Sequence, residues 1–371
     1  MTQTRPLVQL GDRPRILVIR RDNIGDLVCT TPSFRLLRQK FPDAFIAALV
    51  NSYNAPVLYG NTDVDEIFAY VKGKHAGQGE SRLAAWWGKL RLILKIRKLK
   101  FDLAIVASTS PTKNWLRLAR STGARRVLAT VPVGATKPRE VDIAIPYDSQ
   151  FDQRHMTEQI ALLLEPLGIY NAPANLIVHP RSIPSRETRE ISPLKAVQRP
   201  GLRLGIHISA RKVPQRWPTE RFPELIRNLH EILGCRFSLF WAPGSAGDPR
   251  HPGDDDKASE IMKQCDGLPV SAVPTHTVEQ LISGLAEIDA VICSDGGAMH
   301  LAAALDKPIV CFFGNSDVTI WRPWGVPYRV LQPSSHNVAD VSVETVIESV
   351  LDLLQTAGLL MNATTNSNLS N

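Results

Sequence analysis

Short apolar strands that alternate with helices constrain the fold of this chain more than any other feature of its sequence. Residues 15–20, RILVIR, are apolar and β-branched, and residues 26–41 then place their apolar side chains at helical spacing. Further runs typical of buried strands occur at 45–50, 66–70 and 101–107. Repeated βα units of this kind predict an α/β fold with a mostly parallel, doubly wound sheet.

The strand and helix pattern is interrupted once and then resumes. Residues 171–201 carry five prolines and little periodicity, which is typical of a connecting segment. Thr219 is placed to cap a helix in the second half of the chain. The strand-like and helix-like stretches of that half are 202–209, 219–233, 236–241, 277–286, 290–294, 299–305 and 308–313.

A length of 371 residues also favours two domains, because a single hydrophobic core ordinarily stops growing below that size. We predict two Rossmann-like domains that face one another across a cleft, with a ligand between the carboxyl ends of their strands. The predicted parts are a first domain at 1–185, a proline-rich linker at 186–200, a second domain at 201–358 and a polar flexible tail at 359–371.

Charge and cysteine usage narrow the classes of partner and compartment. The formal net charge is +7 and the pI about 9.2, which favours an anionic partner such as a nucleic acid, an anionic lipid or a phosphorylated substrate. No helix-turn-helix, zinc-finger or RNP-like motif is present, so we expect no nucleic-acid partner. The five scattered cysteines contain no C-x-x-C pair, which predicts neither a disulfide framework nor a zinc site. Without a signal-peptide core or a run of about 20 apolar residues, we expect a cytoplasmic location.

The first candidate site is the segment 20–26, RRDNIGD, between the first predicted strand and its helix. This turn lies at the ligand crevice of an open α/β sheet, and Gly25 allows the backbone to turn tightly there. Asp26 has two interpretations. It is an N-cap that accepts the free amides of the first helical turn, or it is a general base in a closed cleft, although a helix N-terminus stabilises a carboxylate and weakens it as a base.

The second candidate site is the segment 294–300, SDGGAMH, where a predicted strand passes through two glycines into a helix. Free amides at a helix start bind anions such as a diphosphate, and small residues allow a ligand to approach closely. Taken alone, the segment favours a structural turn, in which Asp295 caps the helix and His300 packs in the core. The ligand-binding interpretation involves Asp295, Gly296, Gly297, Ala298 and His300.

A third segment, 209–218 or SARKVPQRWP, follows the first strand of the second domain. Its three cations and its hydroxyl suit a diphosphate, because arginine engages phosphate oxygens bidentately. A solvated basic loop is the alternative. The candidate donor-binding residues are Ser209, Arg211, Lys212, Gln215 and Arg216.

Together these segments resemble the ADP-heptose:lipopolysaccharide heptosyltransferases, glycosyltransferase family 9. The set is specific because it occurs in the family's order over roughly residues 15 to 350, whereas each motif alone is weak. The similar stretches are RILVIRRDNIGDLVCTTPSFRLLRQKFPDA at 15–44, HMTEQIALLLEPLGI at 155–169, ISARKVPQRWPTERFPELI at 208–226 and SDGGAMHLAAALDKPIVCFFGNSD at 294–317.

The resemblance implies a GT-B architecture and an inverting transfer that needs no metal or other cofactor. It also implies that the N-terminal domain faces the acceptor, that the C-terminal domain holds an ADP-sugar, and that Asp26 is the catalytic base. Asp295 and His300 fall on the family's donor-site pattern D-x-G-x-x-H. Two positions depart from the family: Gly296 stands where Thr is usual, and Gln215 stands where many members carry a donor-binding Lys.

The acceptor implied by the resemblance is a lipopolysaccharide core or a related glycan at the cytoplasmic face of the bacterial inner membrane. Residues 86–100, WWGKLRLILKIRKLK, hold two Trp and six cations among aliphatic residues, which suits peripheral contact with an anionic membrane surface. A packed helix with a basic solvated face is the alternative. The candidate acceptor- or phosphate-binding residues are Arg20, Arg21, Asn23, Gly25 and Lys113.

Two further functions are compatible with the sequence. One is a transferase or an epimerase that uses another nucleotide sugar on the same fold, and an epimerase needs no membrane acceptor. The other is a catalytically silent nucleotide-sugar-binding protein, which loss of activity in Asp26→Ala with retained donor binding would exclude.

Overall fold

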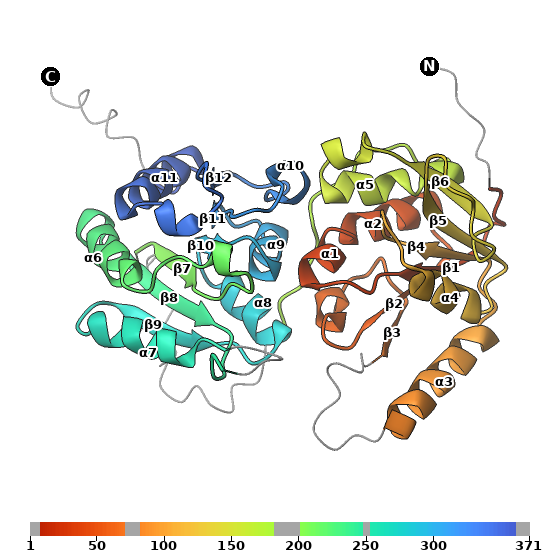
Figure 1. The fold of residues 1–371 in the computed structure, drawn as a ribbon, viewed down its shortest axis with the longest axis horizontal. Helices are drawn as coiled ribbons and strands as arrows, with labels where there is room; N and C mark the ends of the chain where they lie inside the picture. Colours follow the sequence, from red (N-terminus) through yellow and green to blue (C-terminus); the bar gives the residue numbers. More distant parts are fainter. Residues whose placement is uncertain (1–7, 71–81, 182–200, 248–252, 361–371) are drawn as a thin grey trace, which may run out of the picture. The chain divides into compact units, whose positions relative to one another are not determined.

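The structure is a computed structural model that describes residues 8–70, 82–181, 201–247 and 253–360. Its strands form two six-stranded sheets, each with helices on both faces (Figure 1). The chain divides into an N-terminal unit of Met1–His179 with Thr319–Trp324, and a C-terminal unit of Pro180–Val318 with Gly325–Asn371. The predicted linker lies outside the described residues, whereas Leu359 and Leu360 of the predicted tail pack against the C-terminal core.

The sheet of the N-terminal unit has the strand order β3-β2-β1-β4-β5-β6, and every neighbouring pair is parallel. The four strands predicted in this half are all present, and β5 and β6 are additional to the prediction. The strands are β1 (Arg15–Ile19), β2 (Phe45–Asn51), β3 (Glu66–Tyr70), β4 (Leu103–Val106), β5 (Arg126–Pro132) and β6 (Ile143–Tyr147).

Helices α3 and α4 cover one face of this sheet, where Ile96, Leu116 and Ala119 join the buried core, and α2 and α5 pack together on the other face (Figure 1). The helices are α1 (Ile24–Val28), α2 (Thr31–Lys40), α3 (Arg82–Lys98), α4 (Lys113–Ser121) and α5 (Met156–Leu162), with 3₁₀ turns η1 (Ala55–Leu58), η2 (Phe151–Gln153) and η3 (Glu165–Leu167).

The prediction of one helix over 26–41 is wrong, because the chain forms two helices there. The hydroxyl of Thr30 donates to the carbonyl of Asp26 at 2.8 Å, and the hydroxyl of Thr31 donates to the carbonyl of Val28 at 2.7 Å. These side chains compete for carbonyls that a continuous helix would use, and Pro32 starts the second helix because it has no amide hydrogen to lose. The first helix is therefore a short element that carries only the Asp26 turn.

The sheet of the C-terminal unit has the order β12-β11-β10-β7-β8-β9, again with parallel pairs throughout. In chain order this is the same topology as the first sheet. The strands are β7 (Arg203–His207), β8 (Arg236–Trp241), β9 (Val270–Pro274), β10 (Ala290–Ser294), β11 (Ile309–Phe312) and β12 (Tyr328–Leu331).

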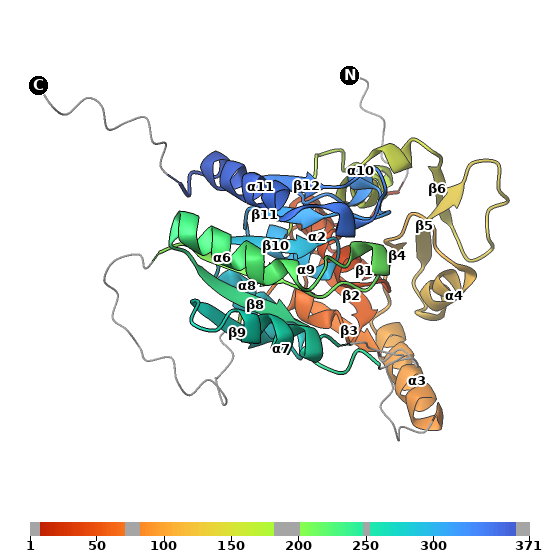
Figure 2. The same ribbon diagram turned by 60° about the vertical axis from the view of Figure 1, so that its left-hand side comes forward.

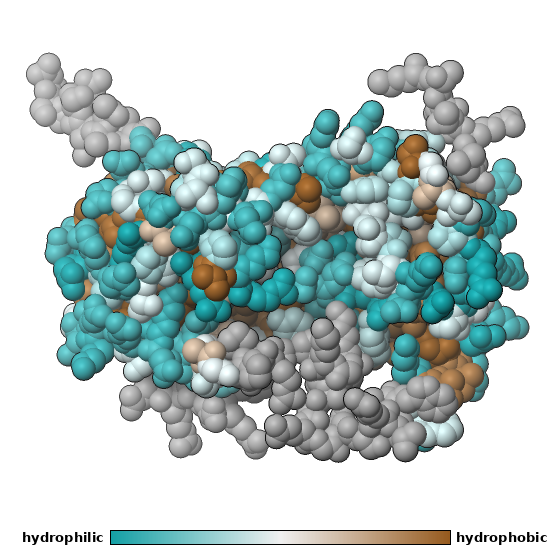
Figure 3. All heavy atoms as spheres, viewed as in Figure 1, coloured by the Kyte–Doolittle hydropathy of each residue, from teal (hydrophilic) through white to brown (hydrophobic). Residues whose placement is uncertain are grey.

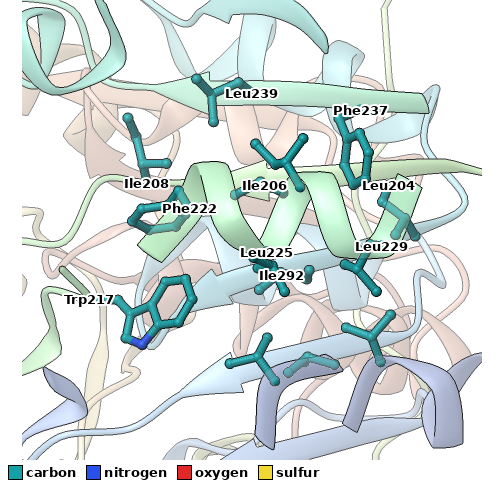
Figure 4. Packing of buried hydrophobic residues seen from close by; sticks show 14 of the residues in the cluster. Leu204, Ile206, Ile208, Trp217, Phe222, Leu225, Leu229, Phe237, Leu239 and Ile292 are labelled. Atoms are coloured by element: carbon teal, nitrogen blue, oxygen red, sulfur yellow. The ribbon is translucent and has the colours of Figure 1, made fainter. Parts of the chain in front are cut away.

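Helices α6, α7 and α11 cover one face of this second sheet (Figure 2). The core between them is built around Trp217, whose ring stacks on Phe312 with centroids 5.1 Å apart. Its ring also makes a T-shaped contact with Phe222 with centroids 4.9 Å apart, and Figure 4 shows these two side chains among the other core residues. The other elements of the C-terminal half are η4 (Val213–Gln215), α6 (Arg221–Leu233), α7 (Asp255–Gln264), α8 (Val278–Ala286), α9 (Gly297–Ala304), α10 (Val318–Trp321), η5 (Val338–Asp340) and α11 (Val343–Thr356).

The predicted cap of helix α6 is wrong by one residue. The N-cap is Glu220, because a turn precedes the helix in which the amide of Phe222 donates to the carbonyl of Thr219 at 3.3 Å.

The segment 319–324 belongs to the N-terminal unit. The prediction that all of 201–358 forms the second domain is therefore wrong for these residues. The ring of His155 stacks on Trp324 with centroids 4.6 Å apart, and its Nε2 lies 2.9 Å from the carbonyl oxygen of Arg322. The indole Nε1 of Trp324 donates to the carbonyl of Ala174 at 3.1 Å. These contacts fix a piece of the C-terminal half on the N-terminal unit.

Candidate functional site

The candidate residues of each unit lie where the strand order of its sheet reverses. The reversal falls between β1 and β4 in the N-terminal unit and between β7 and β10 in the C-terminal unit. In open α/β sheets, this point forms the ligand crevice beyond the carboxyl ends of the strands. The predicted segments follow these strands, with 20–26 after β1, Lys113 after β4, 209–216 after β7 and 295–300 after β10.

The carboxylate of Asp26 is held on both oxygens and is 13 % exposed. Oδ1 accepts a hydrogen bond from Nη2 of Arg20 at 2.7 Å. Oδ2 accepts the backbone amide of Asn23 at 3.0 Å and its Nδ2 at 3.1 Å. The N-cap of α1 is therefore Asn23, and Asp26 is the third helical residue, which bonds back to the cap. Gly25 is a buried residue inside this helix.

Arg20 was predicted to contact the acceptor, but its side chain is only 2 % exposed and is engaged by the protein. Besides Asp26, it bonds to the carbonyl of Ala107 at the end of β4, and its Nε lies 3.3 Å from Oδ2 of Asp22. The guanidinium therefore links the turns after the two strands that flank the reversal point.

Two asparagines that sequence reasoning missed fix the backbone of this turn. Nδ2 of Asn51 donates to the carbonyls of Arg21 at 2.6 Å and Asp22 at 3.1 Å. Nδ2 of Asn54 donates to the carbonyl of Asp22 at 3.1 Å. Both asparagines are buried at or just after the end of β2, and polar residues at a strand end are a signal that points to the crevice.

Arg21 lies against two aromatic rings. Its Nε donates to the hydroxyl of Tyr70 at 2.5 Å, and the guanidinium lies 5.4 Å from the ring of Tyr70 and 5.7 Å from that of Trp115. Burial raises the pKa of the Tyr70 hydroxyl, so this group stays neutral at physiological pH. Lys113 is exposed at the first position of α4, the helix that carries Trp115.

Gln215 connects the candidate segments of the C-terminal unit. Its side chain is 3 % exposed, and its Nε2 donates to Oδ2 of Asp295 at 2.7 Å and to the hydroxyl of Ser316 at 3.0 Å. The hydroxyl of Ser294 donates to the backbone carbonyl of Gln215 at 2.7 Å. The side-chain amide and the backbone carbonyl of Gln215 thus join the loops that follow β7, β10 and β11.

The turn into α9 is open at its first residue. Gly296 is the N-cap in an extended conformation, and an added Cβ would meet no heavy atom nearer than the carbonyl oxygen of Ser294 at 4.0 Å. Gly297 and Ala298 form the start of α9, whose first amides have no helical acceptor. His300 is 2 % exposed, as the core interpretation requires.

The basic loop after β7 presents its charges outward. Arg211, Lys212 and Arg216 are exposed, and Nε of Arg216 donates to the carbonyl of Ala210 at 2.9 Å. The hydroxyl of Ser209 accepts the amide of Ala242 at 2.9 Å, which ties the loop to the end of β8.

Lys257 on α7 is a further cation at this loop, and its helix gave no sequence signal. Its Nζ donates to the carbonyls of Ile208 at 3.1 Å and Trp217 at 3.4 Å, one at each end of the loop. Burial lowers the pKa of this amine to about 8, so it is mostly charged at neutral pH. Lys257 therefore bonds to the backbone at both ends of the basic loop and adds a further positive charge beside it.

Within the ranges that the structure describes, no group of three or more His, Cys, Asp or Glu side chains is arranged to hold a metal ion. All five cysteines are free thiols in buried positions.

Two parallel six-stranded sheets of the same topology, each with polar and cationic residues at its reversal point, are the GT-B architecture of glycosyltransferases. The chain matches the model of glycosyltransferase family 9 (heptosyltransferase) over residues 90–351, and it belongs to this family. The predicted family and fold class are thereby confirmed, although the segment that carries Asp26 precedes the matched range.

Known relatives are similar along most of the chain. Lipopolysaccharide heptosyltransferase 3 of Escherichia coli K12 is 24% identical over 306 residues, which cover 81% of this chain and 82% of that protein. The fold matches a glycosyltransferase family 9 structure from Veillonella parvula with a TM-score of 0.75 at 20% identity, covering 94% of this chain and 99% of that one. It matches ADP-heptose lps heptosyltransferase II of E. coli with a TM-score of 0.69 at 20% identity, covering 93% and 99%.

Proposed function

We propose that this glycosyltransferase moves a heptose from ADP-heptose onto a lipopolysaccharide core or a related glycan, with inversion at the anomeric carbon. The observation that carries the proposal is the Asp26 carboxylate, which three hydrogen bonds hold at the reversal point of the N-terminal sheet while 13 % of it stays exposed. Family membership and the named activities of the relatives support the choice of sugar and acceptor class.

In the proposed reaction, Asp26 takes the proton of an acceptor hydroxyl as that oxygen attacks the anomeric carbon. The bond from this carbon to the diphosphate oxygen breaks, and ADP leaves with the bonding electron pair. Arg211, Lys212 and Arg216 supply the charge that stabilises the leaving diphosphate, together with the free amides at the start of α9. The proposal includes no metal or other cofactor.

On the donor side, we assign sugar and phosphate contacts to the segments that Gln215 joins. Asp295 is a carboxylate that suits sugar hydroxyls, and Gly296 leaves room beside it. The basic loop is fixed by the bonds of Ser209 to Ala242 and of Lys257 to Ile208. His300 is a buried residue of α9. Arg21 and Lys113, together with the exposed Asn23, are assigned to the acceptor side.

Helix α3 supports a peripheral location on an anionic membrane, which we place at the cytoplasmic face of the inner membrane. The helix packs Ile93 and Ile96 inward, whereas Trp87 is 52% and Leu94 50% exposed. Figure 3 shows hydrophobic side chains over α3 among hydrophilic ones, and the exposed cations of the helix are Lys89, Arg91, Lys95, Arg97 and Lys98. Apolar side chains among cations suit the boundary of an anionic bilayer. In the described part of the chain, no helix has the length and hydropathy of a membrane span.

The decisive experiment combines donor binding with turnover. Calorimetry compares ADP-heptose, ADP-glucose, UDP-glucose and ADP, and the release of ADP is measured with lipopolysaccharide truncated at the inner core. Asp26→Asn is expected to bind ADP-heptose like the wild type and to lose transfer. Asp142→Asn is the matched control, because that carboxylate also accepts one arginine and one backbone amide, at 2.7 Å each.

Each alternative function has its own outcome in this experiment. Tight binding of the UDP-sugar alone would overturn the donor assignment. Conversion of the sugar without an acceptor would favour an epimerase, and donor binding without turnover on any acceptor would favour a silent binding protein.

A further inference from the structure

We infer that Asp22 is a reserve counter-ion for the buried guanidinium of Arg20, which allows Asp26 to take up a proton without leaving that cation unpaired. Arg20 and Asp22 are then positioning residues that act through Asp26. The inference rests on the proposed role of Asp26 as the base, and it adds the side chains of Arg20 and Asp22 to the proposed mechanism.

The geometry places one cation between two carboxylates. Arg20 is 2 % exposed, and it lies 2.7 Å from Oδ1 of Asp26 through Nη2 and 3.3 Å from Oδ2 of Asp22 through Nε. Its Nη1 bonds to the carbonyl of Ala107, so the guanidinium cannot follow either carboxylate away. The side-chain amides of Asn51 and Asn54 both donate to the backbone carbonyl of Asp22, which fixes its position.

The two contacts of Arg20 are unequal. The contact with Asp26 is a hydrogen bond, whereas Nε of Arg20 is buried and makes no hydrogen bond within the described residues, despite the closeness of Asp22. A buried donor without an acceptor is costly, and it gains most when a nearby carboxylate turns toward it. In the resting enzyme, the primary partner of Arg20 is therefore Asp26, and Asp22 is a second partner whose bond is incompletely formed.

Proton transfer changes the charge balance of this group. Before the step, one guanidinium faces two carboxylates, and the group has one negative charge in excess. When the acceptor O–H bond breaks and its proton binds the Asp26 carboxylate, one cation and one anion remain, and they neutralise one another. Without Asp22, the same step would leave a buried cation with no counter-ion, which proteins tolerate poorly.

A double-mutant cycle on stability tests the inference without any substrate. Asp26→Asn imitates the neutral state of Asp26, and Asp22→Asn removes the reserve charge. Each single variant leaves Arg20 one carboxylate, so we expect each to lower the Tm of the N-terminal unit modestly. The double variant leaves none, and its Tm should fall by several degrees more than the sum of the single effects. Glu66→Gln combined with Asp26→Asn is the control that should be additive, because Glu66 pairs with Lys95 instead.

Additive effects in the Asp22 and Asp26 cycle would overturn the inference, since the two carboxylates would then not share one cation. Kinetics provides the second readout. Asp22→Asn should lower kcat about tenfold, which corresponds to a barrier higher by about 1.4 kcal/mol, and leave the KM for ADP-heptose unchanged. Asp22→Glu should restore part of the rate.

The failure of the proposed function is distinguishable from the failure of this inference. If Asp26→Asn kept full transfer activity, Asp26 would not be the base, yet the stability cycle would still decide whether Asp22 and Asp26 share Arg20. If Asp26→Asn abolished transfer while Asp22→Asn kept the wild-type kcat, the base would stand and the reserve role would be wrong.

Discussion

The side-chain amide of Gln215 donates to the carboxylate of Asp295 at 2.7 Å, across a separation of 80 residues in the chain. A neutral amide orients the carboxylate without cancelling its charge, whereas a cation at the same position would form an ion pair. We therefore propose that Asp295 accepts hydrogen bonds from the donor sugar, and that the exposed basic loop supplies the charge that faces the diphosphate.

Replacement of Gln215 should affect the donor more than the acceptor. Gln215→Ala leaves one oxygen of Asp295 without its donor, and a hydrogen bond to a charged group contributes about 1.5 to 3 kcal/mol. We expect the KM for ADP-heptose to rise about tenfold or more and the KM for the acceptor to stay the same. Steady-state kinetics with each substrate varied in turn checks this, and equal changes in both KM values would contradict it. Gln332→Ala is a suitable control, because this amide bonds the carbonyls of Gly314 and Ser316 but not Asp295.

Gly296→Thr should be tolerated. The backbone of Gly296 is extended, and an added Cβ has free space, so neither strain nor a clash opposes the larger residue. We expect an unchanged Tm and equal or tighter ADP-heptose binding, measured by thermal unfolding and calorimetry. Gly205→Ala is the contrasting variant, because its Cβ would lie 2.2 Å from Cδ1 of Ile288 and should lower the Tm by several degrees.

The stability of the C-terminal unit should depend on the charge of His207, the last residue of β7. Burial, with a smaller effect of Lys257, lowers the pKa of this imidazole from 6.5 to about 4. Between these two pKa values, His207 binds a proton in the unfolded chain but not in the folded chain. The free energy of unfolding therefore decreases as the pH falls from about 6.5 to about 4. Urea unfolding across this range should show a shallower loss in His207→Gln than in the wild type. Parallel curves would rule out this contribution.

Membrane contact through α3 should depend on its exposed apolar side chains. Leu94→Glu places a negative charge among the cations of α3, and we expect it to reduce cosedimentation with vesicles that contain phosphatidylglycerol. Ile232→Glu is the matched control, because Ile232 is 54% exposed on α6 in the other unit. Equal binding of both variants, or equal binding to vesicles of phosphatidylcholine alone, would argue against this surface.

Local patterns predicted most of the fold because its central strands are continuous apolar runs. The strand β6 escaped prediction because Pro146 and alternating exposed positions mark it as an edge strand. The division between α1 and α2 escaped because helical spacing continues across Thr30 and Thr31, whereas the break arises from their hydroxyls. Apolar periodicity carries no information about such side-chain bonds.

The candidate segments were predictable because strand ends and glycine turns mark a crevice. The hydrogen bonds of these segments were not predictable. The contact between Arg20 and Ala107, for example, spans 87 residues, and nothing in either segment specifies the other. Charge type alone assigned Arg20 to the acceptor, but its burial is a tertiary property. Lys257 was missed for the same reason, because its helix contains no motif and its role follows from the carbonyls above it.

The stack of Trp324 on His155 has a consequence for exchanging parts between members of the family. The chain returns to the N-terminal unit for only the residues 319–324, so a single cut near residue 180 does not yield two self-sufficient halves. A chimaera designed to import the donor preference of a relative would need three junctions. It would replace 180–318 and the chain after 324, and it would keep the recipient's own Trp324 so that the ring of His155 keeps its stacking partner.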